Sequence, residues 1–109
     1  MSDRLPAALE VAGLRRQVEA SGGFATVLKA GDEDRGSILL SILERGAYFG
    51  CLQRGWSSDG YRWRRTGPSE MSELAEFLDR ERRIDPDLWL IELDVPHGER
   101  FIVDIAVTG

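Results

Sequence analysis

Arginines and aromatic rings are interleaved between residues 54 and 65, and no other stretch of the chain is so strong a candidate for binding chemistry. The residues concerned are Arg54, Trp56, Tyr61, Arg62, Trp63, Arg64 and Arg65. Four arginines against Asp59 give this stretch a charge of +3 within a chain of net charge −5. Such a composition is typical of surfaces that bind single-stranded nucleic acid, where rings stack on bases and arginines contact phosphates.

Strand geometry and net charge argue against nucleic acid and favour a protein partner. In an extended segment, Tyr61 and Trp63 point to one face while Arg62 and Arg64 point to the other, which separates stacking rings from phosphate contacts. The negative chain also opposes attraction to nucleic acid or anionic lipid. We therefore predict a non-catalytic protein-interaction module, with a small nucleic-acid-binding protein as the alternative. The predicted contact surface consists of Arg54, Trp56, Arg62, Arg64 and Arg65.

A second cationic pair, Arg15 and Arg16, precedes the glycine pair at residues 22 and 23. Adjacent residues of a helix diverge by about 100°, so only one of the two arginines can point into a given pocket. That arginine could pair with a carboxylate of a partner or with the acidic helix expected at residues 69–85, and the internal partner is the simpler assumption. Arg15 and Arg16 are secondary binding candidates.

Catalytic chemistry has weak support in this chain. His97, the only histidine, lies in a turn-like stretch, and Cys51 lies within an expected strand, where a small core residue is the ordinary interpretation. Glu92 and Asp94 would share one face of a strand, as acid–base work with His97 requires, but their alternation with apolar residues also fits an ordinary solvent face. We predict no enzyme activity from these residues.

Metal and cofactor sites are not expected either. Asp32, Glu33 and Asp34 resemble the start of a calcium-binding loop, but Gly36 comes too early and Leu43 stands where the terminal glutamate would be. The sequence offers no cluster of histidine and cysteine for zinc, and no glycine pattern for phosphate or dinucleotide binding.

Length and composition predict one α+β domain over residues 1–109, with its core in residues 5–107. The 109 residues are 42% hydrophobic, enough for a single core. A single cysteine, no secretory leader pattern and no apolar run near the length of about 20 residues needed to cross a bilayer lead us to expect a cytoplasmic protein that binds no membrane.

Hydrophobic periodicity places the elements of this domain. Ala7, Val11, Leu14 and Val18 predict a helix, although Gly13 leaves open a short strand at residues 9–12 before a shorter helix. Four strands at residues 24–29, 37–44, 47–54 and 61–66 are joined by turn signals, so we expect an antiparallel meander in which the second strand pairs with the first.

The second half of the chain predicts a helix followed by two strands. A charged helix at residues 69–85 should end before Pro86 and lead into an apolar strand at residues 88–95 that contains Trp89. Residues 101–107 alternate like a last strand, whose apolar edge would suit a homodimer. The expected fold is an antiparallel sheet of five or six strands with two helices on one face.

Several of these segments, taken in order, resemble the family of small bacterial proteins known as domain of unknown function 1491. The segments are Leu14-Arg15-Arg16, Gly22-Gly23-Phe24-Ala25-Thr26-Val27-Leu28, Gly31-Asp32, Gly36, and Arg83-Ile84-Asp85-Pro86-Asp87-Leu88-Trp89 with Glu92. The chain departs from the family pattern at Ile84, where an aromatic residue is expected, and from Phe101 onward. The resemblance implies membership of this family and no particular activity.

Overall fold

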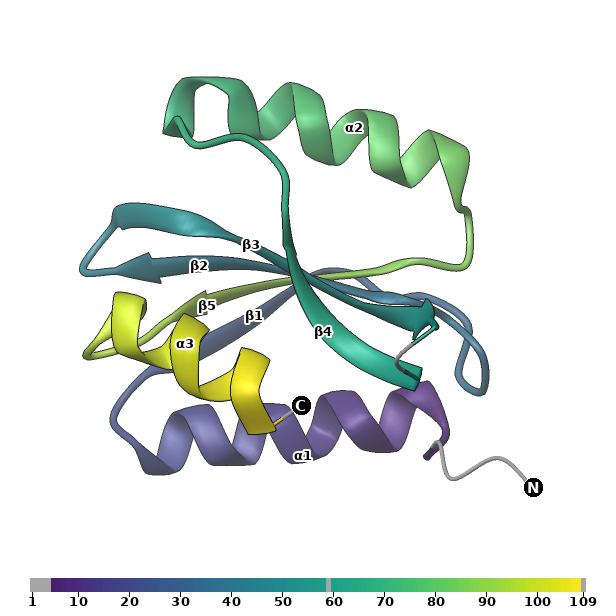
Figure 1. Cartoon of the computed structure of the whole chain (residues 1–109), viewed down its shortest axis with the longest axis horizontal. Coiled ribbons are helices and arrows are strands. Elements are labelled where there is room, and N and C mark those ends of the chain that lie inside the picture. The colour runs from purple at the N-terminus through teal and green to yellow at the C-terminus, as the bar shows by residue number, and fades with distance from the viewer. Residues whose placement is uncertain (1–4, 59, 109) are drawn as a thin grey trace.

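The computed structural model describes residues 5–58 and 60–108, and the described side chains exclude those of Trp56, Ser57 and residues 106–108. The elements, in chain order, are α1 (Ala7–Ala20), β1 (Phe24–Lys29), β2 (Ile38–Glu44), β3 (Ala47–Ser57), β4 (Gly60–Thr66), the 3-10 turn η1 (Met71–Glu73), α2 (Leu74–Ile84), β5 (Trp89–Asp94) and α3 (Gly98–Thr108). They form one α+β domain of three layers. Figure 1 shows the sheet between α2 on one side and α1 with α3 on the other.

The sheet has five strands in the order β1-β5-β2-β3-β4, and it is mixed. β2, β3 and β4 form the expected antiparallel meander. The expected pairing of β1 with β2 is wrong, because β5 lies between them, antiparallel to β1 and parallel to β2. The long crossover through α2 makes the parallel pairing possible, since a parallel pair cannot be closed by a hairpin.

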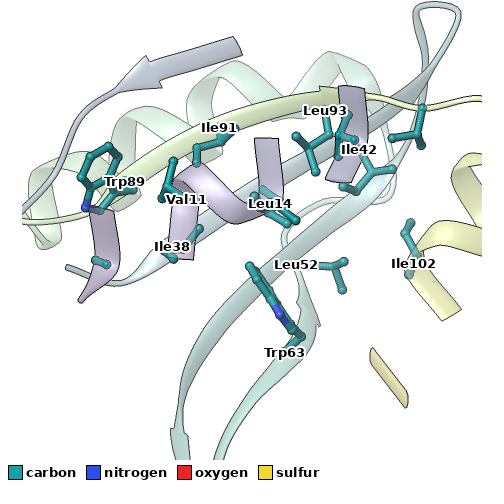
Figure 2. Close-up of a cluster of buried hydrophobic side chains, with 14 residues drawn as sticks. Val11, Leu14, Ile38, Ile42, Leu52, Trp63, Trp89, Ile91, Leu93 and Ile102 are labelled. Carbon is teal, nitrogen blue, oxygen red and sulfur yellow. The ribbon is translucent and has the colours of Figure 1, made fainter. Parts of the chain in front are cut away.

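β2 and β5 are buried on both faces, which explains their place in the middle of the sheet. Cross-strand partners such as Ile38 with Trp89 and Leu40 with Ile91 face α1 and α3. Leu39 and Leu90 face α2 and pack with other residues of that layer. Continuous apolar runs are typical of strands covered on both sides. Figure 2 shows the larger core cluster, with Trp89 at one end and Ile102 at the other.

α1 confirms the helical interpretation of the first segment and rejects the strand alternative. The predicted residues Ala7, Val11, Leu14 and Val18 are its buried face. Gly13 lies within the helix, where an added Cβ would come no closer than 3.8 Å to its nearest neighbour, a nitrogen of Arg16. The glycine therefore weakens the helix without being demanded by close packing.

α2 lies on the opposite face of the sheet from α1, so the prediction that these two helices share one face is wrong. Leu74 is buried, and Phe77 and Leu78 pack against the smaller core cluster. The helix ends at Ile84, as Pro86 predicted. On its outer side, Glu76 and Arg80 form an ion pair at 3.4 Å, which stabilises an exposed helix only slightly.

α3 corrects the prediction of a strand at residues 101–107. Ile102 is buried while Val103 is 53% exposed, a difference that fits a helix with one buried stripe. The helix begins where the Gly98 N–H donates to the Glu44 carboxylate at 2.9 Å. A short segment rich in aliphatic residues is compatible with the periodicity of a strand and with that of a helix. Here the helix forms and packs on β2, β3 and β4. The expected dimer through a C-terminal strand therefore loses its basis.

Among the described residues, no helix has the length and apolar character needed to cross a bilayer.

Candidate interaction site

An open groove runs between α1 and α3 and has β3 and β4 as its floor. Its volume is about 830 Å³. It is lined by Leu5, Leu9, Glu10, Gly13, Leu14, Arg16, Gln17, Arg54, Trp63, Phe101, Asp104 and Ile105. We call it the α1–α3 groove. Leu5, just before α1, and Leu9, within it, are 56% and 59% exposed, so this wall presents apolar side chains to solvent.

Arg54 lies at the centre of the groove floor in an arrangement that fixes its guanidinium. Its Nε lies 2.9 Å from Glu10 Oε2, and both side chains are only 17% exposed. The guanidinium carbon also lies 4.7 Å from the ring centre of Tyr61 and 5.4 Å from that of Trp63, within range of cation–π attraction. Trp63 is the direct cross-strand partner of Arg54. Arg54 therefore joins α1 to the β3–β4 hairpin.

Glu10 keeps an acceptor inside this groove. Its Oε1 is buried and has no hydrogen-bond partner among the described atoms, while Oε2 is paired with Arg54. A buried carboxylate oxygen without a hydrogen-bond donor costs free energy, so the contact of Oε2 with Arg54 compensates the carboxylate only in part.

The other arginines of the predicted surface lie elsewhere. Along β4, Arg62 and Arg64 are exposed while Trp63 is buried and Tyr61 is half-buried, so rings and these arginines take opposite faces as expected. Arg65 is also exposed and pairs across the strands with Leu52.

Trp56 pairs with Tyr61 through its backbone, but its side chain lies outside the described residues. The structure thus places Arg54 in the α1–α3 groove and Arg62 and Arg64 outside it.

The two arginines of α1 are both exposed, and they diverge as helix geometry requires. Arg16 lines the α1–α3 groove, whereas Arg15 is not part of its lining.

Cys51 is a buried residue whose surroundings suppress thiolate chemistry. Burial raises the pKa of the thiol, and the hydrogen bond with Tyr48 offsets this only in part. The Tyr48 hydroxyl lies 3.3 Å from Cys51 Sγ and donates to the Pro68 carbonyl at 2.7 Å. The pKa of Tyr48 is also raised, mainly by burial and to a lesser extent by the contact with the Cys51 thiol. A protonated, inaccessible sulfur is a poor nucleophile, so this pair serves to hold the β4–α2 connection.

Glu92, Asp94 and His97 are not gathered in one hollow. The Asp94 carboxylate accepts the N–H groups of Arg45 at 2.8 Å and Gly46 at 3.1 Å, and it thereby holds the β2–β3 turn. Both turn residues have positive φ angles, 51° and 84°, which a tight hairpin requires. The shallow hollow beside the exposed His97 includes neither Glu92 nor Asp94 in its lining.

The acidic turn at residues 32–34 connects to the start of β5 through hydrogen bonds and close packing. Asp32 Oδ1 accepts the N–H groups of Asp34 and Arg35, and these bonds lower the pKa of its carboxyl. The Trp89 indole N–H donates to the Asp32 carbonyl at 2.8 Å. Gly36 is required here because a Cβ would collide with the carbonyl of Asp87.

No group of three or more histidine, cysteine, aspartate or glutamate side chains among the described residues could hold a metal ion.

The α1 wall of the groove was not predicted from the sequence. Leu9 and Gly13 lie four residues apart on a second face of the helix, and the exposed Leu9 on that face was the available signal. The α3 wall, with Phe101 and Ile105, was hidden by the prediction of a strand. The partner of Arg54, Glu10, lies 44 positions away and had no local signal.

The comparisons with known proteins agree on one family. The model of the family "Protein of unknown function (DUF1491)" matches residues 5–103. A crystal structure of a DUF1491 family protein from Caulobacter crescentus CB15 is 30% identical, with a TM-score of 0.78 over 87% of this chain and 92% of that chain.

Two structures determined in solution agree with this result. An NMR structure of a DUF1491 family protein from the same organism is 31% identical, with a TM-score of 0.76 over 86% of this chain and 88% of that chain. A protein from A. tumefaciens is 32% identical, with a TM-score of 0.73 and the same coverage of both chains. No curated protein matches the chain. Because the family model spans nearly all of the described domain, this chain belongs to the DUF1491 family.

Proposed function

We propose that this protein is a non-catalytic protein-interaction module whose contact surface is the α1–α3 groove. The observation that carries the proposal is the exposed apolar wall formed by Leu5 and Leu9 beside the ion-paired floor of Arg54 and Glu10. Grooves of this size, with apolar walls and a few fixed polar groups, are typical of binding sites. Of the contact residues predicted from the sequence, this proposal keeps Arg54, which lines the groove, and leaves out Arg62 and Arg64.

The groove suits an apolar protein segment. Leucine side chains on one wall and an aromatic side chain on the other favour an apolar occupant. The Arg54–Glu10 pair is neutral overall, so the occupant needs no net charge. An amphipathic helix laid between α1 and α3 meets these requirements.

A catalytic role has less support than binding. The raised pKa and burial of Cys51 argue against a nucleophile, and the Asp94 carboxylate is occupied by two backbone N–H groups. Binding needs only the shape and the fixed groups that the groove already has.

Affinity purification from native lysate, with and without nuclease, tests the proposal when it is run with matched variants. Leu9→Lys places a charge on the groove wall, while Met71→Lys changes a similarly exposed apolar residue of η1 on the other side of the sheet. We expect a captured protein to survive nuclease and the Met71 change but to be lost with Leu9→Lys. Equal capture by both variants, or capture that disappears with nuclease, would overturn the proposal.

Nucleic-acid binding is a second candidate because Arg62, Arg64 and Arg65 are all exposed along β4. Against it, the rings of Tyr61 and Trp63 face the opposite side of the strand from Arg62 and Arg64. Binding through these arginines should weaken steeply with salt, and Arg64→Glu should remove much of it. Fluorescence anisotropy with a labelled single-stranded oligonucleotide across a salt series measures both effects, and no binding at low salt would dismiss this candidate.

A further inference from the structure

β1 is an edge strand with an unusually apolar exposed side. It stands at one end of the sheet order, and only β5 pairs with it among the described residues. Its exposed and half-buried positions alternate, so Phe24, Thr26 and Leu28 face solvent. Phe24 is 73% exposed and Leu28 is 46% exposed. Half of the backbone N–H and C=O groups of such an edge point outward and can pair with another strand.

Over residues 24–28 the strand carries no charged side chain. Its one charged residue, Lys29, lies beyond this segment and donates to the carbonyl oxygens of Pro86 at 2.7 Å and Leu88 at 3.0 Å. Lys29 and the bulge before it therefore protect only the end of the strand. The opposite edge, β4, exposes Arg62, Arg64 and Arg65, the kind of charges that keep edges apart.

We propose that β1 pairs antiparallel with β1 of a second copy of this chain, around a two-fold axis at Thr26. In that register Thr26 meets Thr26, and Phe24 of each copy lies opposite Leu28 of the other. The two exposed apolar residues thus cover each other, and the two threonines form a favourable cross-strand pair. Ala25 faces Val27 on the other side of the joined sheet. The joined strands complete an isologous interface, in which each copy supplies the same surface.

Charge favours a second copy at this edge over the other edge. In the Thr26 register no charged residue of β1 meets its own counterpart, whereas two β4 edges would bring like-charged arginines together. A β-bulge between Val27 and Lys29 bends the end of β1 and limits pairing to residues 24–28. Such an interface is small beside the roughly 1,200–2,000 Å² of stable complexes, so we expect a dimer in the micromolar range.

Sedimentation velocity from about 1 µM to about 500 µM tests the association. The mass should rise from 12.2 kDa toward twice that value. Phe24→Lys should weaken association by at least about tenfold, because each lysine would lie opposite Leu28 of the other copy in place of an apolar ring. Leu9→Lys, which disturbs the α1–α3 groove, should leave it unchanged, so failure here and failure of the proposed function are separable. A wild-type chain that stays monomeric, or a dimer indifferent to Phe24→Lys, would overturn the proposal.

A cysteine placed on the axis tests the register. Thr26→Cys should form a disulfide-linked dimer under mild oxidation, since residues opposite each other across antiparallel strands are close enough to bridge. The native Cys51 is buried and does not compete. Arg64→Cys, on the opposite edge strand β4, should remain monomeric on a non-reducing gel. Equal crosslinking of both variants, or none with Thr26→Cys, would contradict the two-fold pairing.

Discussion

The two edges of this sheet are built in opposite ways. β4 exposes arginines, but it inserts Trp63, only 8% exposed, into the core between them. β1 exposes Phe24 and Leu28, and its half-buried residues Ala25 and Val27 contact the core only at its margin. β4 therefore combines charged exposed residues with a buried tryptophan, while β1 combines apolar exposed residues with shallow contacts to the core. Charged side chains discourage pairing with another strand at the β4 edge, and the β1 edge has no such charges over residues 24–28.

The anchors of the two edge strands also differ in kind. β4 is anchored by the side chain of Trp63, which packs in the core cluster with residues of α1 and contacts the guanidinium of Arg54 in β3. β1 is tied to the start of β5 by the ammonium of Lys29, which contacts backbone carbonyls. Trp63 stabilises β4 by filling volume in the core, whereas Lys29 stabilises β1 through hydrogen bonds. Substitutions at the two edges should therefore lower the free energy of unfolding by different amounts.

The largest expected effect comes from removing an aromatic ring at each edge. Trp63→Ala should lower the free energy of unfolding by about 3–5 kcal/mol, because it leaves a cavity beneath α1 and α3. Phe24→Ala should change it by less than about 0.5 kcal/mol in the monomer, because that ring is mostly in solvent. Urea denaturation followed by circular dichroism at low protein concentration measures both. Similar losses in the two variants would contradict the proposed difference between the edges.

An intermediate effect is expected from replacing one cation at each edge with methionine, which keeps an unbranched stem but removes the charge. Lys29→Met should cost about 1–3 kcal/mol, because the carbonyls of Pro86 and Leu88 lose a charged donor. Arg64→Met, at an exposed position of β4, should stay within about 0.5 kcal/mol. The same denaturation experiment applies. If Lys29→Met were as mild as Arg64→Met, Lys29 would be an ordinary surface cation, and the argument that it anchors β1 would fail.

Sequence periodicity identified most elements but not their neighbours. The spacing of Ala7, Val11, Leu14 and Val18 and the stop at Pro86 are local signals, and both gave the correct helices. The insertion of β5 beside β2 depends on contacts about 50 residues apart, such as Ile38 with Trp89, which no local pattern encodes. The uninterrupted apolar runs at residues 38–40 and 88–91 were compatible with central strands, although they did not specify which strands would be adjacent.

The candidate site was less predictable than the fold for a related reason. The alternation of Tyr61 to Arg64 correctly separated rings from arginines, because side-chain direction in a strand is a local property. The pairing of Arg54 with Glu10 joins a strand to a helix across the tertiary structure, and α3 replaced an expected strand. The groove therefore forms only when α1, β3, β4 and α3 are assembled.

The smallest of the three expected effects concerns the acidic turn that follows β1. Asp32 accepts the N–H groups of Arg35 and Asp34, and these bonds lower the pKa of its carboxyl below the ordinary value of 3.8. A lowered pKa in the folded state means that the stabilisation is fully present above the unfolded value. It is lost as the pH falls through the folded value. Asp32→Asn keeps an acceptor oxygen but removes the charge, so it should be slightly less stable than wild type at neutral pH.

That difference between wild type and Asp32→Asn should shrink as the pH falls below about 4, because the wild-type carboxylate is then protonated as well. Urea denaturation across this range measures it, and the indole N–H resonance of Trp89, which donates to the Asp32 carbonyl, reports on the connection to β5 itself. Asp34→Asn is the matched control, because the Asp34 side chain makes no hydrogen bond to this turn among the described contacts. A pH-independent difference for Asp32→Asn would mean that packing around Gly36 and Trp89, rather than the charge, holds the turn after β1.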